Sequence, residues 1–219
     1  MNENTKNNEV YLMYWLLISL FLLVSIIIIG GLTRLTDSGL SITEWNLVTG
    51  FFPPTNVHDW ENAFNLYKKI PEFKLVNSSM NLNEFKVIYW WEFIHRLLGR
   101  VVGLFFLLPL IYFTLKKMLT KKQIISFYSI FLLIFFQGFV GWYMVKSGLT
   151  ERTDVSHYRL SLHLTIAFIL FILIFWNFLQ LTYYRKKQAI EKTLPNIYLL
   201  VFLILIIFQI SIGAFVSGM

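Results

Sequence analysis

The chain has 219 residues, of which 57% are hydrophobic, 18% aromatic and only 14% charged. Soluble domains are about one quarter charged, so this composition is typical of a membrane protein and excludes a disordered or coiled-coil chain. The absence of cysteine excludes disulfides, cysteine-ligated zinc, iron–sulfur clusters and thiol catalysis. The net charge of +7 lies largely in two short patches between apolar runs, residues 116–122 and 185–192. Such loops are typical of membrane proteins, so we expect no nucleic-acid binding.

Five apolar segments are long enough to cross a bilayer, because its hydrocarbon core needs about 20 residues of helix. They lie at about residues 10–31, 93–115, 124–145, 160–184 and 197–218. The first is too long for a signal peptide, and no cleavage site of small residues follows it. The sequence therefore predicts an all-α fold, a polytopic helical bundle that forms a single membrane domain over residues 1–219.

The basic patches predict the orientation of the spans. They follow the second and fourth spans, and an excess of Lys and Arg marks cytoplasmic connections. We therefore expect the N-terminus in the cytoplasm and the connection at residues 32–91 on the outer side. The same count places Met219 at the outer surface directly after an uncharged span, which suggests that the chain is incomplete.

The outer loop, residues 32–91, is far longer than most connections between helices. Within it, four apolar residues at helical spacing predict an amphipathic helix on the membrane surface: Val57, Trp60, Phe64 and Tyr67. Asn83 is expected to cap a second helix, which begins at Glu84 and continues into the second span. We expect this loop to cover the outer ends of the spans.

The second span begins with ionisable side chains, which are costly inside a membrane and therefore point to function. On a helix, Glu92, His95 and Arg96 share one face, and Arg100 lies at its margin. Glycines on the same face let a helix or a flat ligand approach the backbone closely. This pattern predicts a polar groove at the outer end of the span.

The fourth span carries a second histidine, His163, on the same helical face as Arg159. Because both spans begin at the outer side, His163 and His95 are expected at matching depth. Two such histidines without cysteine favour haem over zinc. Haem propionates pair well with guanidinium groups near the interface, and four are available: Arg96, Arg100, Arg159 and Arg34.

Spacing alone leaves three interpretations of the histidines open. They are axial ligands of a haem, structural residues that hydrogen-bond between helices, or members of a proton or ion pathway. Arginines near the end of a span can also simply extend toward water. A functional conclusion therefore needs more than spacing.

Several motifs, in order along the chain, resemble the heme A synthase family and are most similar to its proteobacterial and mitochondrial branch. They read GGLTRLTDSGLS at residues 30–41, EFIHRLLGR at 92–100, GWYMVKSGL at 141–149 and DVSHYRL at 154–160, followed by His163. Because they are spread over nearly the whole chain after about residue 12, the resemblance is specific.

The resemblance implies an eight-span inner-membrane fold of two four-helix halves, of which this chain would be the N-terminal half plus one helix. It implies oxidation of a methyl group of haem O to the formyl group of haem A for cytochrome c oxidase. His95 and His163 would hold the iron of the substrate haem O, and Glu92 would assist catalysis. A haem b site is expected in the C-terminal half, so we expect this chain alone to be inactive.

The implied partners are the lipid bilayer, haem O, haem O synthase and cytochrome oxidase assembly factors, and self-association stays open. Two rival interpretations remain. A non-enzymatic bis-histidine haem b protein that transfers electrons would need His95 and His163 but not Glu92. A transporter subunit with His and Arg along an ion path would bind no haem.

Overall fold

The computed structural model describes residues 3–46, 49–186 and 196–218, and within these ranges all regular structure is helical. Five long helices are α1 (Glu3–Leu35), α4 (Leu82–Leu115), α5 (Lys121–Glu151), α6 (His157–Lys186) and α7 (Asn196–Ser217). Each of them contains a stretch long and apolar enough to cross a membrane. The predicted all-α fold and its five spans are therefore confirmed.

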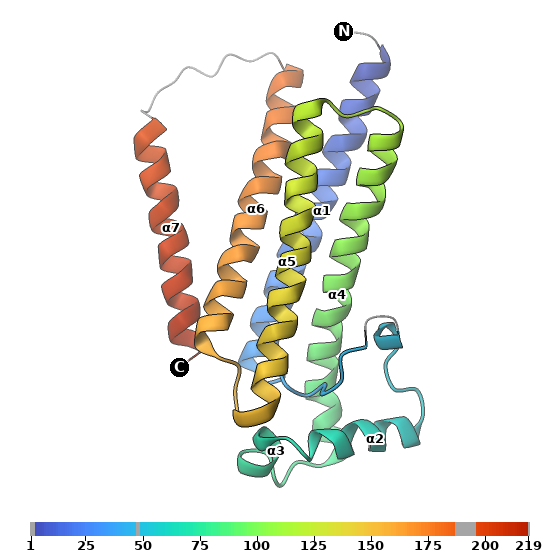
Figure 1. Cartoon of the computed structure of the whole chain (residues 1–219), viewed down its shortest axis with the longest axis vertical. Helices are drawn as coiled ribbons and strands as arrows, with labels where there is room; N and C mark the ends of the chain where they lie inside the picture. Colours follow the sequence, from blue (N-terminus) through green and yellow to red (C-terminus); the bar gives the residue numbers. More distant parts are fainter. Residues whose placement is uncertain (1–2, 47–48, 187–195, 219) are drawn as a thin grey trace.

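Four of these helices form a bundle, and α7 lies along its side (Figure 1). Helix α1 packs on α4 and α6, while α5 packs on the same two helices, so the four close into a ring. Trp15 of α1 lies in the core with its ring centroid 4.7 Å from that of Phe106, and its indole N–H donates to the Phe105 carbonyl at 3.2 Å. Aromatic packing, with the one polar indole atom satisfied, thus holds this level of the bundle.

Helix α7 packs on α6 through small polar side chains. Ser161 donates to the carbonyl of Ser211 at 2.7 Å, and the hydroxyls of Thr165 and Ser211 lie 2.7 Å apart. Hydrogen bonds of this kind join helices inside membranes, where water does not compete for them.

The connections alternate between the two ends of the bundle, as the predicted spans require. The start of α1 and the α4–α5 connection lie at one end, and the long segment between α1 and α4 lies at the other (Figure 1). Most of the second basic patch, residues 187–192, lies outside the described residues, as does Met219.

The long segment folds as a separate small core over the ends of α1, α4 and α5 that lie away from the α4–α5 connection. These ends are called the outer ends here, after the orientation that the basic residues predict. The segment contains a 3₁₀ turn, η1 (Thr49–Phe51), and two short helices, α2 (Val57–Tyr67) and α3 (Pro71–Leu75). The predicted amphipathic helix is therefore present. Its buried residues Phe64 and Tyr67 stack on Phe85 of α4, with centroids 5.0 and 5.2 Å apart, so its apolar face packs against protein.

The start of α4 differs from the prediction. Asn81 rather than Asn83 is the capping residue, because its side chain accepts from the backbone N–H of Glu84 while the Glu84 carboxylate accepts from the N–H of Asn81. This reciprocal pair forms a capping box. Helix α4 consequently begins at Leu82 and extends beyond the expected span into the outer core.

The outer core contains a buried carboxyl group, Glu72, which is only 4% exposed. The Tyr67 hydroxyl donates to its Oε1 at 3.2 Å, and Oε2 has no partner among the described residues. Burial raises the pKa of Glu72 from 4.5 to about 8, since desolvation penalises the charged form. The pKa of Tyr67 is raised for the same reason.

Candidate functional site

The two histidines of the predicted site each lie against a glycine of a neighbouring helix. A Cβ atom built on Gly30 of α1 would lie 2.8 Å from Cε1 of His95. A Cβ atom built on Gly141 of α5 would lie 3.0 Å from Cε1 of His163. The rings therefore sit at the α1–α4 and α5–α6 contacts, at the end of the bundle that the long segment covers.

Both imidazoles keep Nδ1 buried without a hydrogen-bond partner among the described residues. A buried polar atom without a partner is costly, and native structures seldom leave one unexplained. A neutral imidazole can also bind a metal through one of its nitrogens. The donor set and its burial therefore fit a haem iron held between α4 and α6.

Glu92 is 2% exposed, and both of its carboxylate oxygens are engaged. Its Oε2 accepts from the Ser41 hydroxyl and from the Ile42 N–H, each at 2.7 Å, while its Oε1 forms an ion pair with Arg96. Glu92 therefore fastens the segment after α1 to helix α4. It remains beside the histidine, since His95 follows it by three residues.

Arg96 binds the same segment from the other side. Its guanidinium donates to the carbonyls of Ile42 at 2.8 Å and Glu44 at 3.0 Å, and it stacks over the Trp45 ring at 4.9 Å. Only its Nε, which is buried, has no partner among the described residues. Most of its N–H donors are therefore already bonded to other groups of the protein.

Arg100, one turn further along α4, has fewer hydrogen-bond partners than Arg96. It donates through one terminal nitrogen to the Asn46 carbonyl at 3.1 Å and lies over the Phe51 ring at 5.3 Å. Its other terminal nitrogen, NH1, is buried and has no partner among the described residues. This nitrogen is a free donor for an anionic group.

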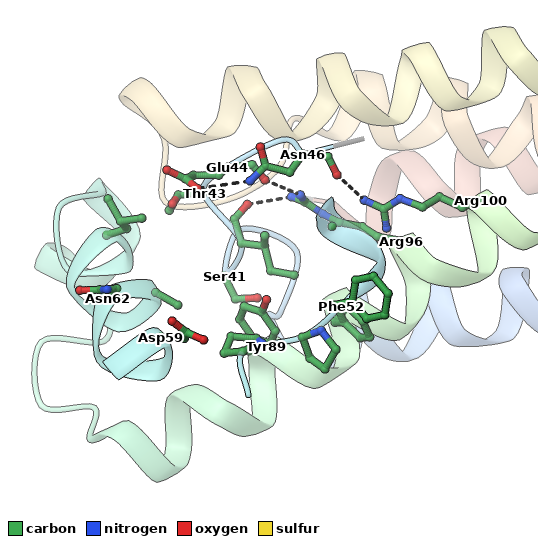
Figure 2. A pocket seen from close by; sticks show the side chains of 17 residues that line it. Ser41, Thr43, Glu44, Asn46, Phe52, Asp59, Asn62, Tyr89, Arg96 and Arg100 are labelled. Carbon is green, nitrogen blue, oxygen red and sulfur yellow. Dashed lines mark hydrogen bonds between the residues drawn. The ribbon is translucent and has the colours of Figure 1, made fainter. Parts of the chain in front are cut away.

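Arg96 and Arg100 line a cavity of about 440 Å³ between the outer segment and α4. Figure 2 shows the two guanidinium groups on one side of it and Asp59 and Asn62 of α2 on the other. Ser41, the partner of Glu92, also lines it. The histidines are not among its lining residues, so the cavity lies beside the imidazoles, on the outer side of the bundle.

The two remaining predicted arginines, Arg159 and Arg34, have partners elsewhere. Arg159 bonds to the Ser147 hydroxyl and lies over the Tyr143 ring at 4.4 Å. Arg34 pairs with Asp37 at 2.8 Å and Asp154 at 3.4 Å. Neither lines the cavity. Arg34 joins the end of α1 to the α5–α6 connection, and Arg159 joins the start of α6 to the end of α5.

Sequence reasoning missed several residues of the site. Gly30 and Gly141 were noticed only as parts of motifs, and Ser41 was not singled out. Gln137 donates to the backbone carbonyl of His163 at 2.8 Å, and its own Oε1 is buried without a partner among the described residues. A polar side chain within an apolar span is expected to bond to a neighbouring helix, and Gln137 does so, but the sequence does not tell which helix lies beside α5.

Known proteins resemble this chain along almost its whole length. The model of the family described as cytochrome oxidase assembly protein matches residues 13–219. A heme A synthase of Pelagibacter ubique is 51% identical over all of this chain and 64% of its own length. Heme A synthases of Agrobacterium fabrum and Flavobacterium psychrophilum are each 47% identical, over 99% and 98% of this chain and 59% and 63% of their own lengths.

The chain thus spans about three fifths of the length of these curated relatives. No solved structure matches it significantly. The family match includes every residue of the site described above, from Gly30 to His163. On this evidence, the chain belongs to the cytochrome oxidase assembly protein family.

Proposed function

We propose that this chain is the substrate-binding part of a heme A synthase, an oxidoreductase that converts a methyl group of haem O to the formyl group of haem A. The observation that carries the proposal is the pair of half-buried histidines, each set against a glycine and each with a buried, unpartnered Nδ1 among the described residues. The names of the relatives supply the reaction.

His95 and His163 would hold the iron of the substrate haem O from helices α4 and α6. They would fix the position of the macrocycle, and the surrounding helices would keep bulk water from the reacting edge. Histidine is a usual axial ligand of haem iron in proteins. The chain supplies both ligands itself, which supports placing the substrate in this half.

Arg100 is the strongest candidate for a haem propionate, because its NH1 is an unused donor beside a cavity open to the outer side. Arg96 would contribute mainly by holding the segment that forms the cavity wall. Arg159 and Arg34 would have to exchange their present partners to reach a propionate, so we rank them below Arg100.

Glu92 would serve as the proton-accepting group near the substrate. Oxidation of a methyl group removes hydrogen from carbon, and a carboxylate one turn from the iron ligand is placed to take up protons. Ser41 bonds to Glu92 and also lines the cavity, so it links the carboxylate to the outer side. The ion pair with Arg96 holds the carboxylate in place beside the histidine.

The remaining parts of the activity are proposed from the relatives and from charge. We propose a bacterial inner-membrane protein with a cytoplasmic N-terminus, as the basic residues of the α4–α5 connection indicate. We place a haem b site in the part of the relatives that lies beyond the aligned residues of this chain. Haem O synthase and cytochrome oxidase assembly factors remain the proposed partners.

The test is to express the chain in membranes that make haem O, purify it and identify the extracted haem by chromatography. We expect haem O or haem A, and its loss in His95→Ala and His163→Ala. His58→Ala is the matched control, because His58 lies in the outer segment and bonds only to Asn62 among the described residues. Recovery of haem B alone would favour an electron-transfer protein, and absence of haem would overturn the proposal.

A further inference from the structure

Gly30 and Gly141 meet the two imidazoles in the same way. The three nearest atoms to a Cβ on Gly30 all belong to the His95 ring: Cε1 at 2.8 Å, Nδ1 at 3.3 Å and Nε2 at 3.7 Å. For Gly141 they all belong to the His163 ring, at 3.0, 3.7 and 3.8 Å. Contacts under 3.0 Å are essentially never made by real Cβ atoms, so the first position excludes any side chain while the ring stays where it is.

General helix packing does not explain these contacts. Small residues in membrane helices usually let two backbones approach, but here the neighbour is a ring and not a backbone. Gly31 and Gly138, on the same two helices, have nothing within 4 Å of a built Cβ atom. The contacts of Gly30 and Gly141 are therefore not shared by these neighbouring glycines, although Gly148, further along α5, also lies close to a side chain, with Leu40 at 2.8 Å from a built Cβ atom.

The two pairs also occupy equivalent places in the bundle. Each histidine lies in the outer part of its own helix, α4 or α6, and each glycine lies near the outer end of the preceding helix, α1 or α5. His95 also interacts with the backbone of Ile26, one turn before Gly30. One wall of each imidazole is thus formed by bare helix backbone.

We infer that Gly30 and Gly141 are positioning residues that set the ring planes of His95 and His163 toward the haem iron, an inference that rests on the proposed function. Metal-bound histidines are usually oriented by a hydrogen bond from the second ring nitrogen. The His95 ring has one hydrogen bond, to the backbone of Ile26, while Nδ1 of each ring has no partner among the described residues. Steric contact with the glycine backbone therefore orients each ring in part, a role that a hydrogen bond has in other metal sites.

The test compares Gly30→Ala and Gly141→Ala with Gly31→Ala and Gly138→Ala, all in the full chain carrying haem. The measurements are haem per protein, the optical spectrum and the electron paramagnetic resonance spectrum of the ferric haem. We expect the first two variants to lose haem affinity by about tenfold or more, as changes to ligand-orienting groups commonly do, or to show altered low-spin signals. The two control variants should match the unmodified chain.

The possible outcomes distinguish failure of this inference from failure of the proposed haem-binding function. If haem binding depends on His95 and His163 but Gly30→Ala and Gly141→Ala match their controls in content and spectra, the positioning role is overturned. If haem is retained in His95→Ala and His163→Ala, the proposed site itself fails. Helix propensity cannot produce the expected loss, because alanine is a better helix former than glycine.

A double variant covers the case in which Gly30→Ala does not fold. The clash involves only His95 atoms, so adding His95→Ala removes it. Recovery of a folded, monodisperse chain in the double variant supports the contact as the cause. A double variant as unfolded as Gly30→Ala overturns it.

Discussion

The two ends of the candidate site are held in different ways. At the Glu92 end, hydrogen bonds and an ion pair join Glu92 and Arg96 to the backbone and side chains of residues 41–44. At the histidine end, glycines form the walls and the Nδ1 atoms have no partner among the described residues. Most polar groups at the Glu92 end are thus bonded to the protein and also hold the outer segment in place, whereas one ring nitrogen of each histidine is left available for a ligand.

The largest effect should follow from removing a ligand. His95→Ala and His163→Ala should each reduce bound haem at least tenfold, because the remaining imidazole provides only one protein ligand. Both chains should still fold, since Nδ1 of neither ring has a partner among the described residues and His95→Ala loses a single bond, to the Ile26 backbone. Haem per protein and the thermal unfolding of the haem-free chains measure the two quantities. If the variants lose haem because they unfold, the histidines are also needed for the fold, and the two ends of the site do not differ in this respect.

Glu92→Gln is expected to lower the stability of the fold, which the histidine variants should leave unchanged. Removing the charge leaves Arg96 buried without its anion, which costs about 3 kcal/mol, and weakens the attachment of the outer segment. We expect a lower unfolding temperature and faster proteolysis of that segment. Glu61→Gln, on an exposed position of α2, is the control. Unchanged stability with lost activity would instead give Glu92 a purely chemical role.

Arg100→Gln tests the assignment of the propionate. The variant loses a charged donor beside the cavity, and hydrogen bonds to charged groups contribute about 1.5–3 kcal/mol. We expect haem affinity to fall by about tenfold, with the low-spin spectrum retained because the histidines are untouched. A titration of the haem-free chain measures the affinity. An affinity equal to that of the unmodified chain would leave the propionates without this partner.

The smallest effect concerns pH and the outer core. Because the pKa of Glu72 is raised to about 8 from 4.5, the folded state retains a proton that the unfolded state releases above pH 4.5. The contribution of Glu72 to the free energy of unfolding is therefore greatest below pH 4.5 and declines as the pH rises to about 8. Glu72→Gln should remove this decline.

At pH 8.5 we expect the Glu72→Gln chain to be more stable than the unmodified chain by about 1 kcal/mol, since the buried amide offsets part of the gain. At pH 4.5 the difference should vanish or reverse. Chemical unfolding at both pH values measures it, with Glu61→Gln again as the control. A stability difference independent of pH would mean that Glu72 is charged in the folded state.

Parts of the site were predictable from local pattern. The face shared by Glu92 and Arg96 follows from helical periodicity, and the structure joins them in an ion pair. The cap at Asn81 was missed by two residues, because Asn81 and Asn83 both suit a capping position and only the box with Glu84 distinguishes them. The partners of Glu92 were not predictable, since Ser41 lies 51 residues away in the sequence.

The sequence by itself determined that this protein crosses the membrane as five helices, because apolar runs of this length must satisfy their backbone hydrogen bonds internally in lipid. It also identified the two histidines as candidate functional residues, because ionisable side chains are energetically costly inside a membrane. Only the tertiary structure decided that Gly30 meets His95, that Gly141 meets His163 and that Glu92 binds the outer segment. Those contacts depend on which helices are neighbours, which packing over the whole bundle selects and no local pattern records.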